Sequence, residues 1–341
     1  MFDPRDKIAD AIAKALDDPQ DVVLARSILG TSNAREIAAR VERLVRESLG
    51  REVAACAGFT QSVGAVFVLD LDGGARVVLK AHAVGDGRLR SHASLHELTA
   101  VYRAQARFAD AGFACARVLL EPRVWPSGAV AIMSFIDASE GDDPHDAGVR
   151  RAMARGLAES ARLGESLAHD LGLPRIALPR GAVFPSPHNA LFDFELAGGE
   201  WIDERARAAR AVLDDVEERV VVMHTDFSAA NVRVRGDRIV AVFDMDSVAR
   251  TDEMRTLASA AVHFTYRGDP PWTWPTRDEA IAFANDYVLA RGRPLDGDEE
   301  TRLDAAAIFA IAYTARCEHA LGSENTAMRD ALLVAPAAYF G

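Results

Sequence analysis

Hydrophobic positions recur at two different spacings along the chain, and the spacing changes near residue 50. Over residues 3–50 apolar side chains return every three or four positions, so that Ile8, Ile12 and Leu16 share one helical face. This period predicts a helical N-terminal extension over residues 1–50 that packs on the lobe that follows it.

From residue 51 the pattern becomes that of β-strands. Val66–Leu71 and Arg76–Lys80 are rich in β-branched residues and flank the turn Asp72–Gly74, which predicts a β-hairpin. Gly58–Gly64 is a run of mostly small residues before this hairpin and predicts a loop between two strands. The other elements expected in this lobe are a helix over residues 93–112 and strands at 118–120 and 129–136.

After residue 136 helical periods dominate. Helices are predicted over residues 148–170, 201–217, 277–291, 298–321 and 323–334, with a Pro-rich irregular stretch over 172–200 and a strand at Val220–Met223. We therefore expect an α+β chain with two lobes, a β-rich lobe over residues 51–135 and a mostly helical lobe over residues 136–341.

Composition narrows the classes of function. The chain has 341 residues, 49% of them hydrophobic and 26% charged, and a formal net charge of −12, which argues against general binding to nucleic acid. Its start lacks the basic and apolar regions of a signal peptide, and no apolar stretch is long enough for a membrane span. The three cysteines lack metal-binding spacing. We expect a cytoplasmic protein, monomeric or homodimeric, without a membrane or nucleic-acid partner.

The motif that carries the chemistry lies between two predicted strands. Residues 224–231 read His-x-Asp-x-x-x-x-Asn, the spacing of a kinase catalytic loop, and Asp244 ends the strand that follows. Moving a phosphoryl group from ATP or GTP needs one carboxylate to accept a hydroxyl proton and oxygen ligands for Mg²⁺. We therefore assign Asp226 as the catalytic base, His224 as the residue that shapes the catalytic loop, and Asn231 and Asp244 as the Mg²⁺ ligands.

A lysine in the predicted hairpin supplies the nucleotide contact. The strand that ends Val-Val-Leu-Lys80 is similar to the strand that presents the phosphate-binding lysine of kinases, so Lys80 is predicted to contact the α- and β-phosphates. Glu97 lies on the next predicted helix and is expected to pair with Lys80. A surface lysine and a solvated glutamate are the alternatives.

Two further segments are candidates for holding the nucleotide. Thr60, Ser62 or backbone N–H groups of the loop at residues 58–64 are predicted to cover the phosphates. The strand that ends at Ser134–Ile136 passes from one lobe to the other, and the backbone of Ser134 and Ile136 is predicted to contact the adenine edge. An ordinary hairpin loop and a plain buried strand are the alternatives.

Three groups of residues each keep two interpretations. Asp246 would share a strand face with Asp244 and is either a second acid of the metal site or a solvated acid. Asp252 and Glu253 either attract a cationic acceptor or are solvated loop acids. An aromatic cluster is either a wall of the acceptor pocket or a packed loop: Tyr266, Trp272 and Trp274.

Together these motifs resemble the aminoglycoside phosphotransferase and choline kinase-like family of small-molecule kinases, from about Val53 to Leu321. The resemblance implies a protein-kinase-like two-lobed fold, the base and metal roles given above, and a hydroxyl-bearing acceptor. The family's usual His-Gly-Asp-Leu-His-Pro-Gly-Asn reads His-Thr-Asp-Phe-Ser-Ala-Ala-Asn at residues 224–231. Its Asp-Leu-Ala reads Thr256-Leu-Ala258, which removes an acid from the start of the next helix.

The sequence thus predicts an ATP- or GTP-dependent phosphotransferase that uses Mg²⁺ and acts on a hydroxyl of a small molecule. An aminoglycoside-like or other cationic alcohol suits the acidic chain. The alternative is a kinase-like protein that holds a nucleotide or a partner without catalysing a reaction. The acceptor itself is not specified by any of these motifs.

Overall fold

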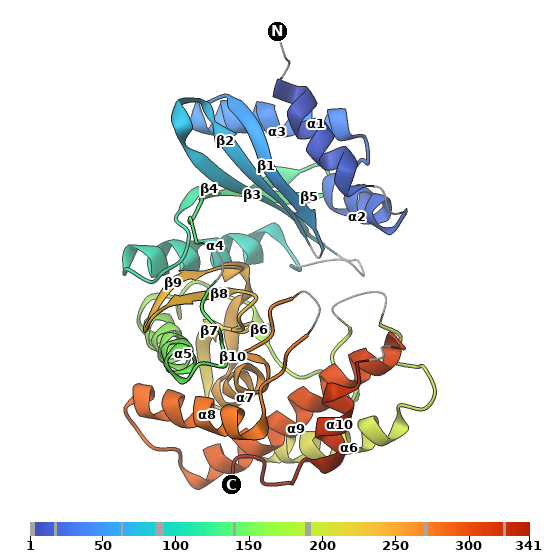
Figure 1. Cartoon of the computed structure of the whole chain (residues 1–341), viewed down its shortest axis with the longest axis vertical. Helices are drawn as coiled ribbons and strands as arrows, with labels where there is room; N and C mark the ends of the chain where they lie inside the picture. The colour runs from blue at the N-terminus through green and yellow to red at the C-terminus, as the bar shows by residue number, and fades with distance from the viewer. Residues whose placement is uncertain are drawn as a thin grey trace. The chain divides into compact units, whose positions relative to one another are not determined.

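The computed structural model divides the chain into two compact units (Figure 1). It describes residues 4–16, 19–62, 64–85, 92–138, 141–187, 192–268, 272–322 and 325–341. The first unit comprises Met1–Ala106 and Ala116–Asp137, and the second comprises Arg107–Cys115 and Ala138–Gly341. Among the described residues, no helix is both long enough and apolar enough to cross a membrane.

The first unit is built on an antiparallel sheet of five strands in the order β1-β2-β3-β5-β4. Its elements are α1 (Pro4–Ala15), α2 (Pro19–Leu29), α3 (Ala34–Leu49), β1 (Val53–Gln61), β2 (Gly64–Leu71), the 3₁₀ turn η1 (Asp72–Gly74), β3 (Arg76–Ala83), α4 (Leu95–Asp110), β4 (Val118–Trp125) and β5 (Gly128–Ser134). The predicted hairpin at residues 66–80 is therefore present as β2, η1 and β3.

Alternating side chains of this sheet supply two cores, as the two-residue period of a strand requires. On β5, Val130 and Ile132 belong to the core shared with α1, α2 and α3. Ala129 and Ala131 belong to a second core shared with Leu98 and Tyr102 of α4. The three N-terminal helices thus cover one face of the sheet and α4 covers the other.

The second unit is mostly helical and holds two small sheets. Its elements are α5 (Ala147–Leu167), β6 (Arg175–Ile176), α6 (Glu200–Asp215), β7 (Val220–His224), β8 (Val232–Arg235), β9 (Arg238–Val242), the 3₁₀ turn η2 (Met245–Ser247), β10 (Val248–Asp252), α7 (Glu253–His263), α8 (Arg277–Arg291), α9 (Gly297–Ala320) and α10 (Ala327–Val334). One sheet has the order β6-β10-β7, and β8 and β9 form a hairpin. The strand before the predicted catalytic loop is therefore flanked by β10.

Two local predictions were wrong, for identifiable reasons. β1 continues to Gln61, with Thr60 paired to Val66, so residues 58–61 of the predicted loop belong to a strand. Ser62 N–H donates to the Gly64 carbonyl at 2.8 Å, and Val63 lies outside the described residues. The small residues that suggested a loop pair well enough within a twisted sheet edge. Likewise β9 ends at Val242, and Asp246 lies in η2, so it does not share a strand face with Asp244.

The close approach of α5 to β7 depends on a glycine. Gly164 of α5 has no side chain at the point where the helix meets β7, and a Cβ there would overlap the Val222 carbonyl oxygen. Because that oxygen belongs to the strand backbone, it has no rotamer that would relieve the overlap. Gly164 therefore allows α5 to lie directly against the strand that leads to the catalytic loop.

We expect Gly164→Ala to lower the free energy of unfolding by at least about 2 kcal/mol, because overpacking against backbone must displace the helix or the strand. Denaturant titration followed by circular dichroism measures this loss. The matched control is Gly297→Ala, since a Cβ at Gly297 has open space around it at the first turn of α9. Equal stabilities of the two variants would contradict the role of Gly164.

Candidate active site

The predicted catalytic loop leaves β7 at His224, whose imidazole ties the loop to the segment after β9. The His224 side chain is fully buried. Its Nε2–H donates to the Phe243 carbonyl at 2.9 Å, and its Nδ1 accepts the Asp226 backbone N–H at 3.2 Å. Both ring nitrogens are thus used, and the backbone donor at Nδ1 fixes the tautomer with hydrogen on Nε2. These hydrogen bonds are compatible with the loop-shaping role that the sequence predicted for His224, and that role stays a prediction.

Asp226 and Asn231 are joined directly. The Asn231 Nδ2 group donates to Asp226 Oδ2 at 2.8 Å and to the Asp226 carbonyl at 3.0 Å. Asn231 is 8% exposed, whereas Asp226 is an exposed residue. Because the amide nitrogen of Asn231 is turned toward Asp226, the carbonyl oxygen of the same amide can act as a ligand for a cation.

A backbone hydrogen bond brings Asp244 next to this pair. Phe243 N–H donates to the Asn231 carbonyl at 2.7 Å, so the residue that precedes Asp244 is fixed on Asn231. Asp244 itself is exposed and has φ 52° and ψ 42°, and it alone among the described non-glycine residues has a positive φ. Residues whose backbone is held in this sparsely populated region of φ and ψ are common at functional sites.

Thr225 fastens the catalytic loop to the turn that follows Asp244. Its backbone N–H and its Oγ1 both donate to the Ser247 carbonyl, at 3.2 and 2.8 Å. A glycine at this position, as in the usual family motif, would lack the second of these bonds. Sequence reasoning did not assign Thr225 a contact, because its partner is a backbone carbonyl, which any residue offers.

Arg233 was also missed. The guanidinium of Arg233 donates through Nη1 to the carbonyls of Ala229, Ala230 and Val232, at 2.6, 3.2 and 3.3 Å, and lies over the Phe243 ring. The Arg233 guanidinium therefore holds three backbone carbonyls at the end of the loop close to one another. No sequence motif marks this residue, because an arginine on a short hairpin strand is usually a solvated one.

The first turn after α7 supports the loop from another side. Ala229 N–H donates to the Phe264 carbonyl at 2.9 Å, and Ala230 N–H donates to the Tyr266 carbonyl at 2.7 Å. The Tyr266 ring stacks on Trp274 at 5.2 Å between centroids, with 7° between the planes. Part of the predicted aromatic cluster is thus a packed structure that borders the catalytic loop.

His263 completes this border. Its Nδ1–H donates to the Ser259 carbonyl at 2.8 Å, and its Nε2 lies 2.8 Å from Thr314 Oγ1. Burial lowers the pKa of His263, although the negative charge of Asp226 acts in the opposite direction. The imidazole is therefore neutral near pH 7, and it stands within the electrostatic reach of the proposed base.

In the first unit, strand pairing places Lys80 and Thr60 in one row of the sheet. Thr60 is opposite Val66, Val66 is opposite Lys80, and Lys80 is opposite Ala131. Opposite residues of an antiparallel sheet point to the same side, and Ala131 lies on the face that α4 covers. Lys80 is 8% exposed, and Glu97 lies in the first turn of α4. The predicted lysine and glutamate thus belong to the same side of the sheet.

Glu97 has a described partner of its own. Its Oε1 lies 3.7 Å from His92 Nδ1, and its backbone N–H donates to Ser94 Oγ at 3.1 Å. The pairing of Glu97 with Lys80 stays a prediction. Ser62 is exposed in the β1–β2 turn, where the missing side chain of Gly64 leaves room beside the Lys80 Cε atom.

At the strand end that was predicted to contact the adenine edge, the backbone N–H of Ser134 already has a hydrogen-bond partner. Ser134 N–H donates to the Arg117 carbonyl at 2.8 Å, and Ser134 Oγ accepts the Arg117 N–H at 2.9 Å. These bonds hold the end of β5 on β4 and use the donor of Ser134. The contacts proposed for the Ser134 carbonyl and for Ile136 stay predictions.

These observations can be set beside known proteins. The family model of the Phosphotransferase enzyme family matches residues 60–302, which is well over half of the chain and includes Lys80, Glu97 and residues 224–246. The chain belongs to this family. No curated protein sequence matches the chain.

Solved structures of phosphotransferases share the fold. The microcompartment-associated aminopropanol kinase is 12% identical, with a TM-score of 0.61 over 88% of this chain and 95% of that chain. Amicoumacin kinase is 11% identical, with a TM-score of 0.60 over 88% and 93%. The ethanolamine kinase of Plasmodium vivax is 11% identical, with a TM-score of 0.53 over 93% and 91%. The predicted protein-kinase-like α+β fold is confirmed, and so is the prediction of a small-molecule phosphotransferase.

Two acids that the sequence left open have a third role in this phosphotransferase. Asp252 and Glu253 are 1% and 2% exposed, so neither is a solvated acid or a surface charge for a cationic acceptor. Asp252 Oδ2 lies 2.6 Å from Arg302 Nε, and its Oδ1 caps α7 by accepting the Met254 N–H at 3.0 Å. Glu253 lies 2.9 Å from Arg291 Nε. Burial raises the pKa of Glu253.

The family's missing acid is replaced by a buried threonine pair. Thr256 is 4% exposed, and its Oγ1 lies 2.9 Å from Thr251 Oγ1. A side chain with this partner joins the start of α7 to β10. Position 256 therefore serves the fold of this phosphotransferase.

Proposed function

We propose that the protein transfers the γ-phosphoryl group of ATP or GTP to a hydroxyl of a small molecule, with Asp226 as the base that receives the hydroxyl proton. The observation that carries the proposal is the direct Asn231–Asp226 hydrogen bond at 2.8 Å, with Asp244 fixed beside Asn231 through Phe243. It supports the set of one base and two metal ligands that the motif spacing indicated.

In the proposed reaction the base needs to be correctly positioned more than it needs to be strongly basic. Phosphoryl transfer passes through a loose transition state, so catalysis rests on alignment and on neutralising charge. In the proposed step the acceptor oxygen attacks the γ-phosphorus, the bond to the β,γ-bridging oxygen breaks, and the hydroxyl proton passes to an Asp226 carboxylate oxygen. The Asn231 amide holds Asp226 Oδ2, which fixes the carboxylate for this task.

The donor set beside the base fits Mg²⁺. The ion prefers oxygen ligands and takes few of them from the protein, and a carboxylate with an amide oxygen satisfies this preference. Asn231 Oδ1 and the Asp244 carboxylate would hold it. The bound ion would supply positive charge to the phosphate oxygens.

The nucleotide assignment draws on related structures. A spectinomycin phosphotransferase was solved in complex with ADP and spectinomycin, and the amicoumacin kinase in complex with AMP-PNP and Ca²⁺. In this chain Lys80 would meet the α- and β-phosphates, with Glu97, Thr60 and Ser62 around it and the strand end at Ser134 and Ile136 along the adenine. The row that Thr60 and Lys80 share on the sheet supports this set.

The acceptor is proposed only as a class. Amino alcohols and amine-bearing antibiotics are named for the related kinases, and an acidic chain suits such cations. The test is a phosphoryl-transfer screen with labelled ATP and labelled GTP against aminoglycosides, macrolides, amino alcohols and sugars. Labelled product from at least one alcohol is expected. Nucleotide binding without transfer to any acceptor and without hydrolysis would favour the non-catalytic alternative.

We expect Asp244→Ala to weaken binding of the metal–nucleotide complex by about tenfold or more, because a carboxylate ligand contributes charge that water cannot replace. Calorimetric titration with ATP, with and without Mg²⁺, measures this change. The exposed Asp237, in the turn between β8 and β9, provides the control variant Asp237→Ala. The assignment fails if the Mg²⁺ dependence of binding is the same in both variants.

A further inference from the structure

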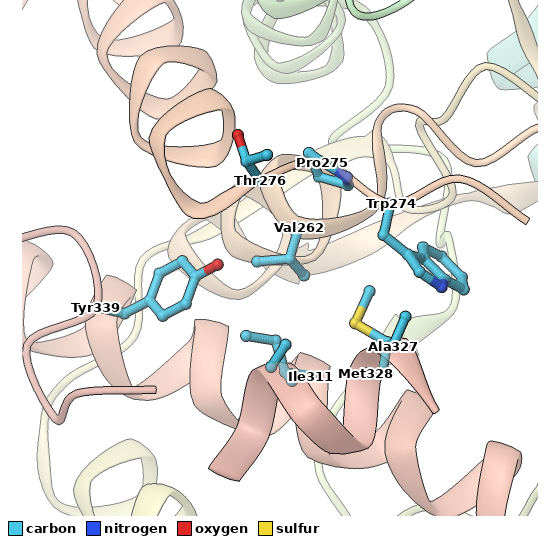
Figure 2. Close-up of a pocket in the computed structure, with 9 residues that line it drawn as sticks. Val262, Trp274, Pro275, Thr276, Ile311, Ala327, Met328 and Tyr339 are labelled. Atoms are coloured by element: carbon cyan, nitrogen blue, oxygen red, sulfur yellow. The ribbon is translucent and has the colours of Figure 1, made fainter. Parts of the chain in front are cut away.

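A cavity in the second unit lies outside the residues proposed for phosphoryl transfer. It has a volume of about 210 Å³ and is enclosed by α7, α9, α10, the segment before α8 and the C-terminal tail. Its walls are apolar and include Val262, Ile311 and Met328 (Figure 2). Thr276 on its edge is exposed, so the cavity opens to solvent there.

One polar group that faces this cavity lacks a partner among the described residues. Tyr339 is 6% exposed, and its hydroxyl, which Figure 2 shows directed into the cavity, takes part in no hydrogen bond within the described part of the chain. Trp274 Nε1 also has no hydrogen-bond partner there, but this atom is buried, so a molecule in the cavity does not reach it. A buried tyrosine usually finds a partner for its hydroxyl. The cavity therefore offers the Tyr339 hydroxyl to a molecule that enters it.

The walls are held in place by contacts that do not involve the cavity. The tail is held by Arg277, which donates to the Tyr339 carbonyl at 2.8 Å, and by Asp304, whose Oδ1 accepts the Phe340 N–H at 2.6 Å. Glu318 of α9 accepts the backbone N–H groups of Met328 and Arg329, both at 3.1 Å, which fixes the start of α10. A cavity between anchored elements is already formed before a ligand binds, which lowers the cost of binding.

The chemistry of the lining defines the ligand. None of the residues that line the cavity carries a formal charge at pH 7. A charged group would lose its hydration there without compensation, whereas an apolar body would gain from burial. An apolar protein cavity of roughly 150 Å³ accepts a benzene molecule, so this one has room for a somewhat larger body.

We propose that the cavity binds a small neutral molecule, or the neutral part of one, with an aromatic or branched alkyl body and an oxygen that accepts a hydrogen bond from the Tyr339 hydroxyl. The Trp274 ring also stacks on Tyr266, whose carbonyl accepts the Ala230 N–H of the catalytic loop. An occupant would thus contact a side chain that borders the proposed active site. The inference concerns binding alone and does not require that the protein transfers phosphate.

The test is a ligand-observed NMR titration of the full chain with acetophenone, which is neutral and carries a carbonyl oxygen. Ethylbenzene, which lacks the oxygen, and benzylammonium, which is charged, are the matched probes. Saturable binding of acetophenone near millimolar concentration is expected, about three- to tenfold tighter than ethylbenzene, with benzylammonium weakest. Absence of saturable acetophenone binding would overturn the proposal.

Variants locate the binding. Ala331→Leu fills the cavity from α10 and is expected to abolish binding of both neutral probes, whereas Ala208→Leu, on the exposed side of α6, is expected to leave it unchanged. Tyr339→Phe keeps the ring and should remove the preference for acetophenone over ethylbenzene. Unchanged acetophenone binding in Ala331→Leu, or an unchanged preference in Tyr339→Phe, would each refute the site.

A final competition experiment tests whether the ligand of the cavity is part of the phosphoryl acceptor or a separate small molecule. Each alcohol that is phosphorylated in the transfer screen is added to the acetophenone complex. Displacement assigns the cavity to the apolar part of the phosphoryl acceptor, and joint binding assigns it to a separate small molecule. Both results support the site, and the binding titrations stand even if no alcohol is phosphorylated.

Discussion

Asp226→Ala is expected to reduce phosphoryl transfer by about 1000-fold or more while nucleotide binding is largely kept. The carboxylate is the group proposed to receive the hydroxyl proton, and the Asn231 amide holds it in position at 2.8 Å. Asp226→Asn is expected to behave alike, because an amide preserves the shape of the side chain and cannot accept the proton. Steady-state kinetics with the acceptor found in the screen, together with calorimetric nucleotide titration, measure both effects.

The matched control for Asp226→Ala is Asp237→Ala. Asp237 is exposed, as Asp226 is, and it lies in the same unit, in the turn between β8 and β9. Its removal is expected to change transfer by less than about twofold. Transfer at the wild-type rate in Asp226→Ala would remove the assigned base and with it the proposed mechanism.

Arg302→Met is expected to lower the free energy of unfolding by about 3–5 kcal/mol, since it leaves the Asp252 carboxylate buried without its partner. Arg302 Nε lies 2.6 Å from Asp252 Oδ2, and Arg302 Nη1 donates to the Leu213 carbonyl at 2.8 Å. The guanidinium thus joins the start of α7 to the end of α6. Denaturant titration at neutral pH measures the loss.

Two variants test the cause of this loss. Arg162 forms an exposed pair with Glu159 on α5, and Arg162→Met should change stability by no more than about 0.5 kcal/mol. Adding Asp252→Asn to Arg302→Met removes the uncompensated charge and should restore at least about 1 kcal/mol. A loss in Arg302→Met no larger than that in Arg162→Met would show that the pair is not a buried, strongly coupled one.

The sequence predicted most of the architecture because each lobe has a clear period. The helix at 277–291 was placed at its observed bounds, since Thr276 and Glu279 form a capping box and Gly292 ends the helix in the left-handed conformation. The N-terminal helical period also held, although three helices divide it. The loop expected at 58–64 was wrong because small residues within a strand and in a turn look alike when the pairing is unknown.

The candidate site was predictable as a set of residue types and less so as a geometry. The spacing placed His224, Asp226 and Asn231 in one loop between two strands, and hydrogen bonds link Asp226 to both of the others there, while their roles stay predictions. Contacts made by Thr225 and Arg233 could not be foreseen, since their partners are backbone carbonyls that any residue offers. Asp252 and Glu253 were misjudged because their arginine partners lie far along the chain, beyond the reach of any local pattern.

The hydrogen bonds of the catalytic loop have a kinetic consequence. Four consecutive amides, from Ala229 to Val232, each donate a hydrogen bond to a carbonyl of the described structure. Such amides exchange their hydrogens with water only when the loop opens, so the loop should show the slow exchange of a strand although it has no regular structure. Little conformational entropy of this loop then remains to be lost when a ligand binds beside it.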